Sequence, residues 1–156
     1  MTVEKTDFLK NRFIPLLIEI PSDQKPRWGK MTLQQMIEHF ADSVRIASGL
    51  TVHQLIITPP ENLQRMQDFL VSDKPFRENT ANPLMPEVPA PVKIASIEKA
   101  IDELHSELKH FFGVFEANPH LTTRNPLFGD LNFQQNVQLL YKHALHHLRQ
   151  FGVGIE

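Results

Sequence analysis

The chain contains no cysteine among its 156 residues. This absence excludes disulfide bonds, a thiolate nucleophile and any zinc or iron–sulfur site built on cysteine sulfur. A metal ion bound by this chain would therefore need nitrogen or oxygen ligands.

Runs of like charge and long apolar stretches are also missing. The 16 basic and 18 acidic side chains give a formal net charge of −2, which gives no electrostatic reason to expect a nucleic-acid or anionic-membrane partner. No stretch approaches the roughly 18 apolar residues of a membrane span. Residues 1–10 have charges spread through them and lack the apolar core of a secretion signal. We therefore expect a cytoplasmic protein that binds neither nucleic acid nor membrane.

The apolar residues, 41% of the chain, are sufficient for one substantial core. Together with the length, they predict a single domain spanning residues 1–156. Apolar side chains recur at helical spacing in several segments, and no alternating pattern predicts a strand. The expected helices are 8–20, 33–47, 63–70, 97–115 and 133–151.

Cap residues mark the boundaries of these helices. Polar side chains suited to an N-cap precede four of them, and the first helix ends at Pro21 after a bend expected at Pro15. A glycine at position 49 is placed to end the second helix. The expected N-caps are Thr32 (with Gln35 as a capping box), Thr58, Ser96 and Asn132.

Prolines at positions 75, 83, 86, 89 and 91 disfavour a helix or a central strand between residues 73 and 93. This segment is predicted to be a long ordered loop that lies over the helices as a wall or lid. Residues 125–130 are rich in turn formers. The overall expectation is an all-α fold, a four-helix bundle with a long Pro-rich loop.

Histidines near the C-terminus suggest a metal site. His143 and His147 stand one helical turn apart, the spacing that lets two imidazoles reach one ion, whereas His146 points well away. His39 lies on the flank of the second helix, which a neighbouring helix of a bundle could bring close to the pair. Three histidines would suit Zn²⁺, Ni²⁺ or Fe²⁺ and leave a position open. Taken alone, the His143–His147 spacing and the single His39 are each explained more often by ordinary packing than by metal binding.

Other polar side chains fit a solvated surface better than a site. Glu107 and His110 match one Glu-x-x-His element of di-iron bundles, but that chemistry needs two such elements, and His110 falls on the polar side of its helix. His105 is expected to be partly buried at the edge of the apolar stripe. Lys142 and Arg149 are expected on the polar side of the last helix, facing solvent.

Three segments together resemble the DinB/YfiT-like superfamily of metal-dependent proteins: 28–39 (WGKMTLQQMIEH), 125–129 (NPLFG) and 141–151 (YKHALHHLRQF). In that superfamily a tryptophan precedes the helix that carries the first histidine, and two further ligands stand four residues apart on the last helix. The resemblance implies that His39, His143 and His147 bind one divalent metal ion. Zn²⁺ and Ni²⁺ are the preferred candidates for this ion, and Fe²⁺ is the next.

The resemblance also implies an activity class. Members share a four-helix bundle, are often dimeric, and include thiol-dependent S-transferases and isomerases that use bacillithiol or mycothiol, as well as proteins described as hydrolases. We therefore expect a metal-dependent hydrolase or a thiol-dependent S-transferase that acts on a small molecule. The resemblance also implies that the protein is a homodimer. Asn125 stands where the closest relatives would have histidine, and Asn136 where an aromatic would be expected, so the substrate stays open.

No catalytic base can be assigned from the sequence. Glu38 adjoins His39 but points about 100° away from it on a helix. The alternative function is a non-catalytic helical protein that binds a small ligand or a partner, in which the histidines hold a structural metal ion or none.

Overall fold

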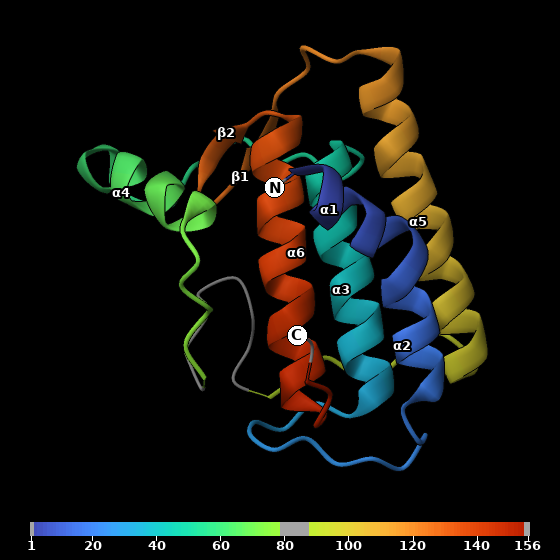
Figure 1. Ribbon diagram of the computed structural model, residues 1–156. Helices are drawn as coiled ribbons and strands as arrows, with labels where there is room; N and C mark the ends of the chain where they lie inside the picture. Colours follow the sequence, from blue (N-terminus) through green and yellow to red (C-terminus); the bar gives the residue numbers. More distant parts are fainter. Residues whose placement is uncertain (1, 79–87, 155–156) are drawn as a thin grey trace.

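The computed structural model describes residues 2–78 and 88–154, and it is mostly helical (Figure 1). The centre of the predicted Pro-rich loop, residues 79–87, lies outside the described residues. None of the helices in the described ranges is both long and apolar enough to cross a membrane. The elements in chain order are α1 (Thr2–Asp7), the π-helix η1 (Phe8–Arg12), α2 (Phe13–Glu19), α3 (Leu33–Ser48), α4 (Pro60–Val71), α5 (Ile97–Ala117), β1 (Thr123–Asn125), β2 (Gly129–Leu131) and α6 (Phe133–Gln150).

The long helices pack side by side around one apolar core. Helix α3 contacts both α5 and α6, and α2 contacts α5, while α1 and η1 lie against α6. Figure 1 shows α2, α3, α5 and α6 with roughly aligned axes, and α4 projecting to one side. The largest fully buried side chains of the core include Phe13, Leu17, Met36, Phe40, Leu104, Phe111 and Phe151.

The predicted N-caps of the histidine-bearing helices are confirmed. Thr32 accepts a hydrogen bond from the backbone N–H of Gln35, whose side chain accepts one in return from the backbone N–H of Thr32. Asn132 and Gln135 form the same reciprocal capping box at the start of α6. Gly49 ends α3 with a φ of 81°, a conformation that side chains disfavour. These caps fix where each helix starts and hence which residues face the core.

The N-terminal helical stretch begins earlier than the sequence predicts. It starts at Thr2 instead of residue 8, and a π-turn over Phe8–Arg12 interrupts it. Within this turn the backbone N–H of Phe13 donates to the carbonyl of Phe8. Pro15 follows in α2, where it lacks an N–H and its ring would crowd the carbonyl four residues earlier. The π-turn is where the chain accommodates this proline.

The mostly helical structure agrees with the all-α prediction, but it also contains one short hairpin that no alternating pattern in the sequence predicted. Strands β1 and β2 form an antiparallel hairpin around residues 126–128. The side chain of Asn125 closes the turn by accepting hydrogen bonds from the backbone N–H groups of Leu127 and Phe128. Arg124 forms a bidentate ion pair with Asp130 across the strands. Three-residue strands are too short to give an alternating sequence pattern.

The predicted N-cap of the short helix is wrong. Pro59 is the N-cap of α4 and Pro60 is its first residue, where a missing N–H costs nothing. The Thr58 hydroxyl instead donates to the carbonyl of Leu127 at 2.6 Å. Thr58 therefore ties the start of α4 to the hairpin turn.

Asn136 links α6, the hairpin and α3 through one buried side chain, which is only 1% exposed. Its amide nitrogen donates to the hydroxyl of Thr123 at 3.0 Å and to the carbonyl of Leu131 at 3.2 Å. The Thr123 hydroxyl in turn donates to the carbonyl of Ala47. Asn136, where the resemblance led us to expect an aromatic residue, thus has a structural role in this chain.

Replacing Asn136 with alanine should lower the free energy of unfolding by about 1–3 kcal/mol, because buried acceptors would lose their donor. Urea titration would measure this loss. The matched control is Gln134→Ala, which changes an exposed amide on the same helix and should stay within about 0.5 kcal/mol of the parent. Equal effects of both substitutions would contradict the role assigned to Asn136.

Candidate metal centre

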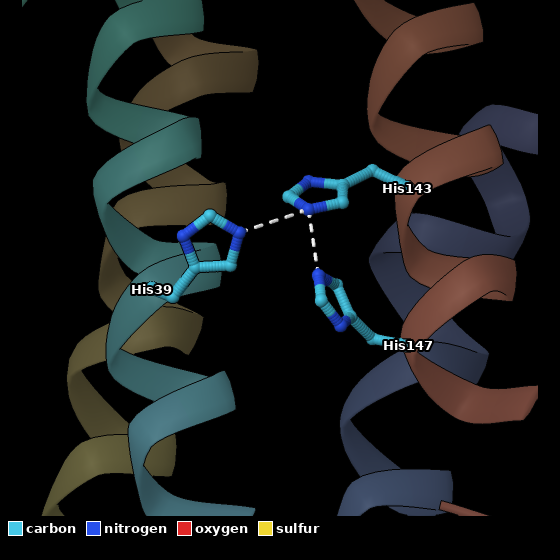
Figure 2. Close-up of side chains that lie close together, drawn as sticks. All are labelled: His39, His143 and His147. Carbon is cyan, nitrogen blue, oxygen red and sulfur yellow. Dashed lines mark hydrogen bonds between the residues drawn. The ribbon is translucent and has the colours of Figure 1, made fainter. Parts of the chain in front are cut away.

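The structure brings together the three histidines that the sequence singled out. His39 extends from α3 toward His143 and His147, which stand one turn apart on α6 (Figure 2). The Nε2 atom of His143 lies 3.1 Å from Nε2 of His39 and 2.8 Å from Nε2 of His147. The candidate ligand atoms of all three lie within 4.8 Å of one another.

These separations fit a shared metal ion. Two imidazole nitrogens bound to zinc at about 2.0–2.1 Å, with an angle of roughly 90–109° between the bonds, are roughly 2.8–3.4 Å apart. The two Nε2 separations at His143, 3.1 Å to His39 and 2.8 Å to His147, lie within this range. Neutral imidazoles that all direct lone pairs at one point repel each other unless a proton or a cation lies between them. An Nε2–H of His143 can donate fully to only one of its two neighbours, whereas a shared cation would account for both short separations.

Burial keeps the three imidazoles neutral. His147 is buried, and His39 and His143 are half-buried. Desolvation lowers the pKa of His39 to about 4, even though the nearby Asp42 carboxylate opposes the shift. Desolvation, reinforced by the other histidines, lowers the pKa of His147 to about 3 and that of His143 well below its usual value. Neutral imidazole is the form that binds metal ions.

Gln150 fixes the proton position on His147. Its amide nitrogen donates to the backbone carbonyl of Trp28 at 3.0 Å, which orients the amide because a carbonyl can only accept. The amide oxygen then faces Nδ1 of His147 at 2.7 Å, so Nδ1 must carry the hydrogen. The lone pair on Nε2 of His147 is left free to face the other histidines. Such outer partners orient the ligands in metal sites.

Sequence reasoning missed Gln150, although a signal was present. It stands three residues after His147, and residues at that spacing are neighbours on a helix surface. A search for polar side chains one turn from each candidate ligand would have found it.

Aromatic rings surround the histidines. The ring of Phe40 stacks on that of His143 with centroids 4.8 Å apart. The ring of Phe76 lies edge-to-face with that of His143, with centroids 6.3 Å apart. His146 does not belong to the group of three histidines, as expected. Its ring packs between those of Trp28 and Phe76, with centroid separations of 5.4 and 6.0 Å. Its Nδ1 atom is buried and has no hydrogen-bond partner among the described residues. The candidate site therefore has a largely apolar wall.

Glu38, next to His39, has a structural contact. One carboxylate oxygen accepts from the backbone N–H of Lys93 at 2.8 Å, and the other accepts from the N–H of Ile94 at 3.3 Å and from the Gln34 side chain. Both oxygens are thus engaged in holding the chain before α5 against α3. This contact gives no support for Glu38 as a general base.

The expectation that Lys142 faces solvent is wrong, because its side chain is only 7% exposed. Its ammonium donates to the backbone carbonyls of Ser72 and Lys74 and lies 4.6 Å above the ring of Phe69. The helical pattern places Lys142 on the polar side of α6. That side is covered by α4 and the residues after it, which sequence periodicity does not reveal.

The other histidines considered as candidates lie elsewhere. His110 is exposed, as expected, and Glu107 pairs with Arg45 instead. His105 is exposed, contrary to the expectation of partial burial. Within residues 2–78 and 88–154, His39, His143 and His147 form the one group of three or more acidic or histidine side chains close enough to share an ion.

No protein-family model, curated protein or solved structure matches the chain. The case for a metal centre therefore depends on the geometry of the three histidines and on the sequence pattern that singled them out.

Acid should destabilise the metal-free protein through these histidines. Their pKa is about 6.5 in an unfolded chain but about 4 for His39 and about 3 for His147 in the fold. Within that window the unfolded chain binds more protons, so the free energy of unfolding should fall as the pH drops below about 6.5. Well above pH 6.5 these histidines should not make the free energy of unfolding depend on pH.

Urea titrations at about pH 7 and about pH 5 would measure this dependence, and the variant His147→Gln should show a smaller drop because it removes one depressed group. His110→Gln, which changes an exposed histidine, is the control. A drop of the same size in His147→Gln and in the parent would contradict the burial of a neutral imidazole at position 147.

Proposed function

We propose that this chain binds one divalent metal ion through Nε2 of His39, His143 and His147, as a member of the DinB/YfiT-like superfamily. In this proposal α2, α3, α5 and α6 are the four-helix bundle, and residues 73–93 are its Pro-rich loop. The observation that carries the proposal is the convergence of three neutral imidazole nitrogens from two helices. The sequence resemblance, which places ligands at these three positions, gives additional support.

The ligand chemistry narrows the choice of ion. Neutral imidazole suits Zn²⁺, Ni²⁺ and Fe²⁺, and the chain has no sulfur ligand from cysteine. We expect the bound ion to be Zn²⁺ or Ni²⁺, with Fe²⁺ as the next candidate. Three protein ligands are typical of catalytic zinc sites, which keep a position for water or substrate, whereas structural sites use four.

An ion held this way would act as a Lewis acid that lowers the pKa of water or of a thiol, or that polarises a carbonyl. The protein's own contribution is positional. The three histidines define the site, Gln150 holds the ring of His147, and Phe40 and Phe76 limit contact with bulk water. We infer a metal-dependent hydrolase or a thiol-dependent S-transferase that acts on a small molecule, with a low-molecular-weight thiol as co-substrate in the second case.

The purified protein should bind about one ion per chain after equilibration with Zn²⁺, Ni²⁺ or Fe²⁺. His143→Ala and His147→Ala should lose that ion and keep their helical circular dichroism, whereas the exposed control His110→Ala should keep the ion. Elemental analysis after gel filtration measures the content. A parent protein that retains no ion, or a His143→Ala variant that still retains one, would contradict the proposal.

Activity assays on the same preparations separate catalytic from structural metal. Ester hydrolysis and thiol transfer with several low-molecular-weight thiols should require the ion and disappear with His143→Ala. Activity that survives complete removal of metal would contradict the proposed chemistry. Unfolding on metal removal, without activity in the loaded protein, would favour a structural ion.

Replacing Gln150 with leucine should weaken metal affinity by about 10–100-fold, because His147 would lose the partner that sets its proton and ring orientation. Competition with a chromophoric chelator would measure the affinity. Gln134→Ala, an exposed change on the same helix, should leave it unaltered. Unchanged affinity in Gln150→Leu would show that the ring of His147 is held by packing alone.

A further inference from the structure

Lys142 is a buried lysine that metal binding does not explain. An ammonium group has three N–H donors, and here the carbonyls of Ser72 and Lys74 and the ring face of Phe69 supply three partners. Its hydrogen bonds in the described part of the chain go to backbone carbonyls, and the Asp73 carboxylate acts on it only as a nearby opposite charge. Burying an ammonium group costs free energy unless hydrogen bonds replace its contacts with water, and these partners supply such a replacement.

Those contacts cap a helix. Helix α4 ends at Val71 and Ser72 is its C-cap residue. Carbonyls at a helix C-terminus lack intrahelical donors and carry partial negative charge, which a cation stabilises. The ammonium of Lys142 therefore fastens the end of α4, and the residues just after it, to α6. A methionine at position 142 would fill a similar space but would leave these carbonyls without their donor.

The fastened segment leads directly to the candidate metal centre. Pro75 follows the captured carbonyl of Lys74, and its ring restricts the backbone at both residues. Phe76 comes next, and its ring lies edge-to-face with the rings of His143 and His146, with centroid separations of 6.3 and 6.0 Å. Its backbone also interacts with the imidazole of His146. With Lys74 held and Pro75 stiff, the ring of Phe76 has little freedom to leave the histidines.

We propose that Lys142 is a positioning residue of the metal centre. By holding the carbonyls of Ser72 and Lys74, it keeps the ring of Phe76 against His143 and His146, and this ring restricts the access of small molecules to the histidines. The functional meaning of this role rests on the proposed metal site. The restriction of access is a property of the metal-free protein and can be tested without an ion.

The first measurement uses metal-free protein and diethyl pyrocarbonate, a small reagent that modifies neutral imidazole. Mass spectrometry would locate the modified histidines and give a rate for each one. Lys142→Met and Phe76→Ala should each raise the rates at His143 and His146 by about fivefold or more, because local opening then exposes the rings. The exposed His110 and His120 are internal references whose rates should not change.

Two further variants separate positioning from packing. Lys142→Arg keeps N–H donors at this site and should restore most of the protection that Lys142→Met loses. Lys10→Met removes another lysine that lies over a phenylalanine, 4.8 Å above the ring of Phe112, and should have no effect on either rate. The double variant of Lys142 and Phe76 should be within about twofold of Phe76→Ala, because both changes act on the same contact.

The second measurement follows the loss of Zn²⁺ to excess EDTA from loaded protein. Release should accelerate about fivefold or more in Lys142→Met and Phe76→Ala, while each still binds the same number of ions as the parent at saturation. A parent protein that binds no ion would defeat the proposed function, and the diethyl pyrocarbonate rates would still decide the role of Lys142.

Three outcomes would overturn the positioning role. The first is an unchanged rate at His143 and His146 in Phe76→Ala, because the ring would then shield nothing. The second is a Lys142→Met variant that is folded and modified at the parent rate. The third is independent action of the two residues, in which the double variant is modified faster than either single variant by the product of their separate effects.

Discussion

The burial of three neutral imidazoles between α3 and α6 is the constraint on which the rest of this structure depends. Their Nε2 atoms converge to separations of 2.8 and 3.1 Å at His143, and a single Nε2–H of His143 can donate fully to only one of its two neighbours. Packing of the apolar faces of α3 and α6 supplies the energy that holds the rings there. A cation shared by the three Nε2 atoms would account for both separations, which is why we propose a metal centre there.

The contacts around the three histidines follow one pattern. The residue before each of two proposed ligands fastens a distant part of the chain: Glu38 holds the backbone at Lys93 and Ile94, and Lys142 holds the backbone at Ser72 and Lys74. Both ends of the Pro-rich segment are thereby attached to the helices that carry the histidines. Residues that look like surface charges in the sequence thus shape the wall of the site.

Much of the helical framework could be predicted because its signals are local. Capping boxes at Thr32 and Asn132 and the glycine at position 49 set the helix boundaries, and the one-turn spacing paired His143 with His147. The approach of His39 is a tertiary contact over 104 residues, so periodicity alone could not give it. Its place on the flank of a helix made His39 a candidate, and the resemblance selected it as the third ligand.

The features that the sequence did not predict share a physical cause. The hairpin strands are too short for a pattern, and the burial of Lys142 depends on α4 covering a helix face that is polar in the sequence. The bonds of Asn136 to Thr123 and Leu131 likewise join segments whose proximity is set by the packing of whole elements. Such contacts follow from the fold and carry no signature in the sequence window around each residue.

X-ray absorption spectroscopy of the metal-loaded protein tests the central claim most directly. The account predicts about three imidazole nitrogens at about 2.0–2.1 Å from a zinc ion, with the remaining coordination from a light exchangeable ligand, and the loss of one imidazole when His39 is replaced by alanine. A coordination shell with no more than one imidazole, or a spectrum that the His39 substitution leaves unchanged, would contradict it.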